Sequence, residues 1–174
     1  PTEPRRQVGD NPPMGTVEKI VIARRTGVCY GVREAIDKAK SARAEGKRTH
    51  TLGHVVHNEG LIADLRERGI ENAETLDDVH EGAAVVIRAH GVTPEVLERA
   101  GARGLEVIDG TCTWVTQEHR ELRRLVDDGY DIVLLGTPHH PEVVGLLGFA
   151  PDAILVDEEE DWVKIPRRKR LALI

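Results

Sequence analysis

Short apolar runs alternate along the chain with segments whose apolar residues recur every three or four positions. The runs predict strands at 19–23, 48–52, 84–89, 106–109, 131–135, 153–156 and 170–174. The segments after Cys29 and Cys112 each place their apolar residues on one helical face. Strands that alternate with helices in this way predict an α/β fold built on largely parallel sheets.

An internal repeat divides this pattern into two copies. The motif G-x-C-x-x-V at 27–32 recurs at 110–115, and L-G-x-x-x-H-x-E at 52–59 recurs at 135–142. Cys29 and Cys112 are 83 positions apart, and so are His57 and His140. A shared spacing for two motifs predicts duplicated units of about 83 residues at 17–99 and 100–174. Residues 1–16, rich in proline, are expected to form a disordered tail.

Composition narrows the function classes. The 174 residues are 40% hydrophobic and 31% charged, which indicates a globular protein with a core. A net charge of -6 and a total of two Trp, two Tyr and one Phe argue against nucleic-acid binding. The longest apolar run, 83–87, is too short to cross a bilayer. With two cysteines and no apolar leader, we expect a cytoplasmic protein with reduced thiols and no membrane partner.

The two cysteines are the first candidates for chemistry. Each follows a glycine at a predicted strand-to-helix turn, the edge of a parallel sheet where ligands usually bind. A helix N-terminus favours the thiolate, which is the form that binds metal. An isolated cysteine is more often a small buried hydrophobe, but two equivalent thiols favour ligands of one centre. Zinc is the alternative metal, although the close cysteine pairs typical of structural zinc sites are absent.

Three histidines, His57, His90 and His140, follow predicted strands and should lie on the same rim. Imidazoles beside free helix amides suit a phosphate or diphosphate. Glu142, two positions after His140, is a candidate for proton transfer. A helix-capping carboxylate is the commoner use of Glu in a first turn, and we assign that role to Glu59.

The other histidines have weaker claims. His119 lies four residues beyond Val115 on a predicted helix and is expected to be a satisfied packing residue. His80 lies in the acidic stretch 77–81, which is expected to be a solvated face. His50, His54 and His139 carry no specific prediction.

Six segments together carry a family resemblance. They are T-G-V-C-Y-G-V at 26–32, V-V-H-N at 55–58, A-H-G-V at 89–92, D-G-T-C at 109–112, V-T at 115–116 and H-P-E-V at 140–143. In order and spacing, over roughly residues 18–174, they resemble the 4-hydroxy-3-methylbut-2-enyl diphosphate reductases, also called LytB. The resemblance implies reductive removal of a hydroxyl from an allylic diphosphate at the end of the non-mevalonate isoprenoid pathway. The products would be isopentenyl and dimethylallyl diphosphate.

The resemblance also implies the site. Family members have three similar α/β units around a cavity, and each unit gives one cysteine to a 4Fe-4S cluster. Carried over by motif, the cluster ligands are Cys29 and Cys112, the diphosphate contacts are His57, His90 and His140, and the proton donor is Glu142. An external electron donor such as a ferredoxin or flavodoxin is implied as well.

Parts of the family pattern are missing or altered. The third unit and its cysteine would lie beyond Ile174. Thr113 and Trp114 stand where a proline-containing segment usually follows the second cysteine, and Gly110 replaces a common alanine. We therefore expect the N-terminal two units of such a reductase, catalytic only with the third. The alternative is a homodimeric iron-sulfur binding or electron-transfer module with two cysteines per chain.

Overall fold

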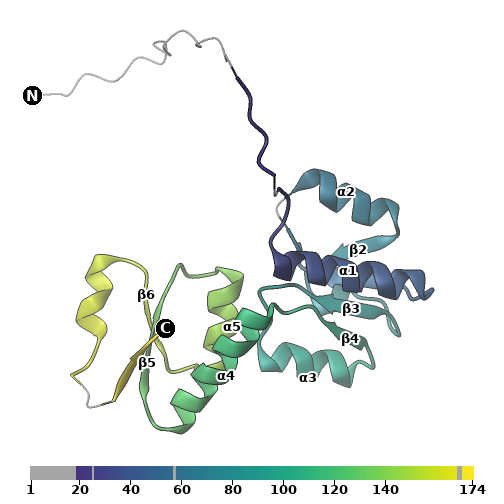
Figure 1. Cartoon of the computed structure of the whole chain (residues 1–174). Helices are drawn as coiled ribbons and strands as arrows, with labels where there is room; N and C mark the ends of the chain where they lie inside the picture. The colour runs from purple at the N-terminus through teal and green to yellow at the C-terminus, as the bar shows by residue number, and fades with distance from the viewer. Residues whose placement is uncertain (1–18, 25, 57, 168–169) are drawn as a thin grey trace, which may run out of the picture.

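The structure, a computed structural model, describes residues 19–24, 26–56, 58–167 and 170–174 and forms two α/β lobes (Figure 1). In chain order the elements are α1 (Tyr30–Ala44), β1 (Thr49–Leu52), α2 (Glu59–Glu67), β2 (Ile70–Ala73), the short 3-10 helix η1 (Leu76–Asp78), β3 (Ala84–Ile87), α3 (Pro94–Ala102), β4 (Glu106–Asp109), α4 (Thr113–Asp127), β5 (Asp131–Leu135), α5 (Pro141–Phe149), β6 (Ile154–Val156), the 3-10 helix η2 (Glu159–Lys164) and β7 (Leu171–Leu173). The predicted tail at 1–16 lies outside the described residues.

The first lobe is a four-stranded parallel sheet in the order β2-β1-β3-β4. All four residues of β3 are buried, because helices cover both faces of the sheet. Val86 packs with Ile36 and Leu65 of α1 and α2 on one face. Val85 packs with Ala100 of α3 on the other face, as expected for side chains that alternate along a strand.

The second lobe repeats this plan. Its parallel sheet has the order β6-β5-β7, which matches β2-β1-β3, and α4 begins 83 positions after α1, at Thr113 instead of Tyr30. Leu122 of α4 and Leu146 of α5 pack on Ile132 and Leu134 of β5. The predicted α/β fold with a duplicated unit is therefore confirmed.

Three details differ from the sequence predictions. Residues 19–23 form no strand, and Ile20 to Ile22 are 75–82% exposed, because no strand among the described residues pairs with them. Strand β2 was not predicted, since Glu71 and Asn72 interrupt its apolar pattern. Strand β4 pairs with β3, so the first sheet takes its fourth strand from the segment 100–174 assigned to the second unit.

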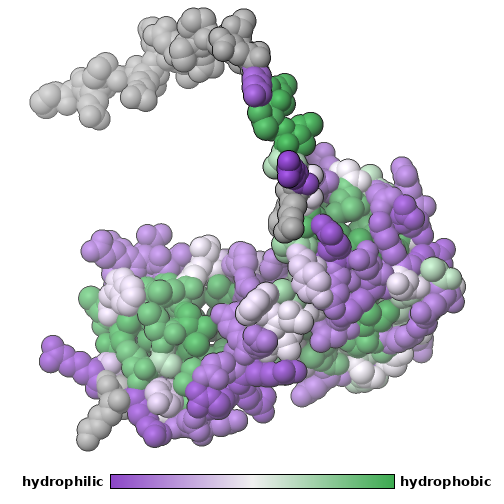
Figure 2. Space-filling model, in the orientation of Figure 1, coloured by the Kyte–Doolittle hydropathy of each residue, from purple (hydrophilic) through white to green (hydrophobic). Residues whose placement is uncertain are grey.

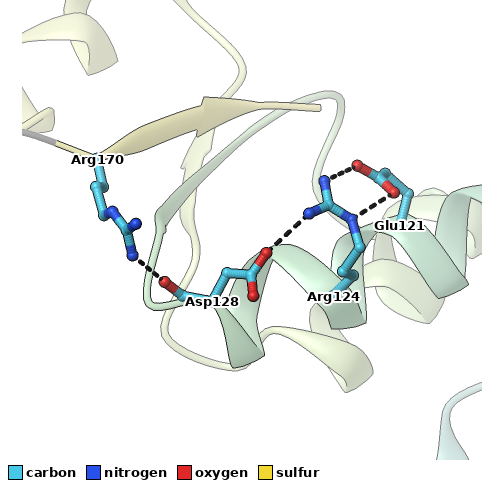
Figure 3. A network of polar contacts seen from close by, with 4 residues as sticks. All are labelled: Glu121, Arg124, Asp128 and Arg170. Carbon is cyan, nitrogen blue, oxygen red and sulfur yellow. Dashed lines mark hydrogen bonds and ion pairs between the residues drawn. The ribbon is translucent and has the colours of Figure 1, made fainter.

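Polar contacts tie the end of α4 to β7 (Figure 3). Arg124 contacts Glu121 of the same helix and Asp128 at its C-cap, and Arg170 donates to the Asp128 carbonyl oxygen at 2.5 Å. The guanidinium of Arg170 also lies 5.3 Å from the ring centre of Tyr130. These contacts hold the start of β7 against the C-terminal end of α4, the helix whose N-cap is Cys112.

Hydrophobic surface is visible over the second lobe (Figure 2), and Leu135, Leu171 and Leu173 on its strands are exposed. The two lobes meet where α5 packs against the segment after β3: a Cβ added at Gly148 would lie 2.5 Å from Thr93. No helix among the described residues is long and apolar enough to span a membrane.

Candidate functional site

The two cysteines hold equivalent positions in the two lobes. Cys29 is the N-cap of α1 and Cys112 is the N-cap of α4, and neither forms a disulfide. A Cβ added at Gly31 would lie 2.8 Å from the Cys112 Sγ, so the second thiol lies against the first turn of α1. Cys29 is exposed and Cys112 is partly exposed, so both thiols remain accessible. Gly31 leaves the room that this approach requires.

Hydrogen bonds fix the turn that carries Cys112. Its backbone N–H donates to the carbonyl oxygen of Ala89, just after β3, at 2.9 Å. The Asp109 carboxylate accepts from the Thr111 backbone N–H at 2.9 Å, and Lys38 of α1 donates to the Asp109 carbonyl oxygen at 2.7 Å. This turn is therefore anchored both to β3 and to α1.

Gly110 leaves no room for a side chain, because a Cβ there would collide with the Ile87 carbonyl oxygen. Gly110 thus lets this turn lie against the end of β3.

Two of the three predicted phosphate-binding histidines lie face to edge. The rings of His90 and His140 have centroids 5.8 Å apart and planes at 87°. His140 is the N-cap of α5, and its Nδ1 accepts the Glu142 backbone N–H at 3.3 Å. In the neutral ring the proton is then on Nε2, which leaves that atom as a donor for a ligand. His57, the third predicted histidine, lies outside the described residues.

The backbone just before His140 is strained. His139 has φ of 70°, in the left-handed region that residues other than Gly adopt uncommonly, although Asn, Asp and His are found there more often than most. His139 lies in a turn and its side chain is exposed, whereas His140 caps α5. Such strain often accompanies a functional turn.

Glu142 lies half-buried in the first turn of α5. Burial raises the pKa of Glu118, and the Glu142 charge raises it further. Burial lowers the pKa of His119, while the charges of Glu142 and Asp109 act in the opposite direction. The Glu142 carboxylate is therefore within electrostatic reach of two titratable groups on α4.

His119 packs as the sequence predicted, stacked on Phe149 with centroids 4.4 Å apart. The expectation that it is fully satisfied is not met, because its buried Nε2 has no hydrogen-bond partner among the residues that the structure describes. A Cβ added at Gly145 would lie 3.5 Å from this Nε2 and 3.7 Å from the His90 carbonyl oxygen. His119 therefore lies near Gly91 of the first lobe and Gly145 of the second, where the lobes meet.

Arg88 is a cationic residue that the sequence reasoning missed. It lies two positions before His90, and it lines a cavity of about 390 Å³ together with Gly53 of the first lobe and Pro141 of the second. Burial lowers the pKa of its guanidinium, and the Glu74 charge opposes this. An arginine in the segment V-I-R-A-H-G, two positions before a candidate phosphate ligand, was the available signal.

The described candidate residues thus gather where the lobes meet. The Cys112 thiol lies against α1, and the Cys112 backbone is bonded to the residue that precedes His90. The His90 ring contacts His140, which in turn is bonded to Glu142. Thiols, imidazoles and a carboxylate therefore share one region, where soft ligands, hydrogen-bond donors and a proton carrier could act together.

The chain is similar to known proteins of one family. The family described as "LytB protein" matches residues 20–174. A protein of Geobacter sp. strain M21 is 34% identical over 157 residues, which cover 90% of this chain and 56% of that protein. A protein of Nocardia farcinica is 41% identical over 149 residues, which cover 85% of this chain and 44% of that protein. Both are described as 4-hydroxy-3-methylbut-2-enyl diphosphate reductases, and this chain spans about half of their length.

Solved structures give the same result. One described as (E)-4-hydroxy-3-methyl-but-2-enyl diphosphate reductase, the terminal enzyme of the non-mevalonate pathway, has a TM-score of 0.80 and 34% identity, with 88% of this chain and 56% of that chain covered. A reductase structure from Plasmodium falciparum has a TM-score of 0.80 and 30% identity, with 85% and 48% covered. From the family match over residues 20–174, the identities and the shared fold, this chain belongs to the LytB family.

Proposed function

We propose that this chain provides two of the units that build the site of a 4-hydroxy-3-methylbut-2-enyl diphosphate reductase. The reaction adds two electrons and two protons to the substrate, breaks its allylic C–O bond and releases water with isopentenyl or dimethylallyl diphosphate. The observation that carries the proposal is the meeting of Cys112, the first turn of α1 and the His90–His140 pair at the junction of the lobes.

The donor set fits part of an iron-sulfur site. Cys29 and Cys112 are free thiols at helix N-termini, and the absent Cβ of Gly31 leaves space beside the Cys112 sulfur. In the proposal these thiolates are two ligands of a 4Fe-4S cluster, and a third cysteine comes from outside this chain. When bound, such a cluster supplies electrons and a Lewis-acidic iron for the substrate hydroxyl.

The remaining residues bind substrate and hold a proton. His140 donates from Nε2 to a diphosphate oxygen, because its Nδ1 is occupied by the Glu142 backbone N–H. His90 and His57 complete the proposed diphosphate contacts. Glu142 carries a proton for the departing hydroxyl, and its position in the first turn of α5 places it two residues from His140.

The partners follow from the chemistry. The substrate is an allylic diphosphate, and the two electrons come from an external one-electron carrier such as a ferredoxin or flavodoxin. A cytoplasmic setting, in which thiols stay reduced, belongs to the same proposal.

Anaerobic reconstitution tests this function. The chain is reconstituted with iron and sulfide alone and together with the C-terminal part of a LytB relative, and iron content, electron paramagnetic resonance and product formation are measured. The proposal expects a cluster signal that responds to substrate, with product formed, only in the completed assembly. A redox-active cluster that forms in the chain alone, and whose electron paramagnetic resonance signal does not change with substrate, would instead favour the homodimeric electron-transfer module.

A further inference from the structure

A second group of metal-binding side chains lies away from the proposed reductase site. His50 is the second residue of β1, Glu71 is the second residue of β2, and the parallel register pairs them directly. His80 stands four positions before β3, the strand on the other side of β1. These residues cluster near the amino ends of the strands, whereas the candidate reductase residues lie beyond the carboxyl ends.

The three side chains converge closely enough for one ion. His50 Nε2 lies 3.3 Å from His80 Nδ1, and His50 Nδ1 lies 3.8 Å from a Glu71 carboxylate oxygen. One donor atom from each residue lies within 4.8 Å of the other two. A single ion takes one nitrogen from each imidazole, and the unpartnered His50 Nδ1 is the one that faces Glu71. Two ligands of a tetrahedral zinc are roughly 3.3 Å apart, so spacings within 4.8 Å require only small movements of the exposed Glu71 and His80 side chains.

The buried histidine gives an independent reason to expect a ligand. His50 is 2% exposed, and its Nδ1 has no hydrogen-bond partner among the residues that the structure describes. The 3.8 Å to Glu71 is too long for a hydrogen bond. Buried polar atoms are normally satisfied, and an unsatisfied imidazole nitrogen that faces a carboxylate suits a shared cation.

We propose that His50, Glu71 and His80 bind a divalent transition-metal ion, with Zn²⁺ the preferred occupant. Two imidazoles and one carboxylate match the ligand preference of zinc and differ from the all-oxygen sets of magnesium and calcium. Because Glu71 and His80 are exposed, water completes the coordination. The bound ion ties β1, β2 and the segment before β3 together and stabilises the first lobe, since it binds the folded chain.

Glu71 also has a competing neighbour. The Arg48 guanidinium lies 3.9 Å from the same carboxylate oxygen that faces His50, with both side chains 55% exposed. An exposed pair of this kind contributes little, so the ion can replace it. In this respect the acidic stretch around His80 is more than a solvated face.

Zinc binding by the full chain provides the test. Affinity is measured by competition with a chromophoric zinc indicator, and thermal unfolding is followed with and without Zn²⁺. The exposed ligands are changed in His80→Ala and Glu71→Gln, which leave the buried His50 in place. The matched controls are His54→Ala and Glu74→Gln, an exposed pair 3.6 Å apart in the same lobe.

We expect one zinc ion at this site, an affinity loss of more than about tenfold in His80→Ala, and a zinc-dependent rise in Tm that only the two ligand variants lose. Binding should persist when Cys29 and Cys112 are both changed to serine, and Co²⁺ bound to that variant should show no thiolate charge-transfer absorption. Equal zinc affinity in the wild type, His80→Ala and Glu71→Gln would overturn the proposal. Loss of all zinc binding in the double cysteine variant would overturn it as well. Neither result depends on the reductase function.

Discussion

His140 of the second lobe meets His90 of the first edge to face, with ring centroids 5.8 Å apart. The contact joins a helix cap to the segment that follows a buried strand, so neither lobe could form this pair alone. The duplicated fold thus does more than repeat a unit. It brings together two histidines from non-equivalent positions of the two copies. The proposed chemistry depends on this contact between the lobes.

The helix cap and the proposed ligand contact of His140 can be separated. In His140→Asn the new side chain can still accept a backbone N–H and begin α5, but it lacks the imidazole Nε2–H. Loss of a hydrogen bond to a charged group costs about 1.5–3 kcal/mol, so diphosphate affinity in the completed assembly should fall roughly 10- to 150-fold. Calorimetric titration with the substrate measures this.

The control for His140→Asn is His139→Asn, because Asn tolerates the left-handed backbone of His139. That variant should keep wild-type affinity. If both variants bind the diphosphate as tightly as the wild type does, His140 has only a capping role.

Gly31 should be required for cluster assembly although it carries no ligand atom. In Gly31→Ala the added Cβ would lie 2.8 Å from both Cβ and Sγ of Cys112, so the thiol must move. We expect lower iron and sulfide content after reconstitution of the completed assembly, with both cysteines still titratable by a thiol reagent. Gly101→Ala in α3 is the matched helix substitution, since its Cβ meets nothing within 4 Å. Full iron content in Gly31→Ala would show that the two helix N-termini need not approach this closely.

The repeat itself supplies a control for the proton-transfer role. Glu142 and Glu59 occupy equivalent first-turn positions 83 residues apart. Glu142→Gln keeps the size of the side chain but removes its titratable proton, so kcat should fall at least about 100-fold with little change in substrate affinity. Glu59→Gln should leave kcat close to the wild-type value. Equal kcat in wild type and Glu142→Gln would remove Glu142 from the reaction.

The sequence predicts the elements that local patterns determine better than those that depend on contacts between distant segments. Strand β5 was predicted with its observed bounds because Ile132, Val133 and Leu134 form an apolar run that is buried at its centre. Strand β2 was missed because Glu71 and Asn72 have weak strand propensity, and its pairing with β1 stabilises it instead. Residues 19–23 show the reverse case. Their strand propensity is high, but they form no strand because no strand among the described residues pairs with them.

The candidate site follows the same rule. The placement of Cys29 and Cys112 at helix N-termini is a local property, and the repeated motif predicted it. The approach of Cys112 to Gly31 depends on how the lobes pack, which no motif records. Arg88 was missed for the same reason, since only the cavity lined by both lobes makes it a candidate ligand-binding residue.

The buried His119 should make the fold sensitive to acid. Burial lowers its pKa from the ordinary 6.5, more than the charges of Glu142 and Asp109 raise it. Above pH 6.5 the imidazole is neutral in both the folded and the unfolded chain, and its contribution to stability is fully present. As the pH falls below 6.5 the unfolded chain takes up the proton first, so stability is lost until the pH passes the lower folded pKa.

Substitution of His119 isolates this effect from the other titrating groups. His119→Gln cannot protonate, so the loss of unfolding free energy between about pH 7.5 and about pH 5.5 should be smaller than in the wild type. Glu118 does not imitate this, because burial raises its pKa and its contribution is lost as the pH rises through that value. Urea unfolding at the two pH values measures the difference. An identical loss in both proteins would mean that the His119 ring is protonated as easily in the folded chain as in the unfolded one.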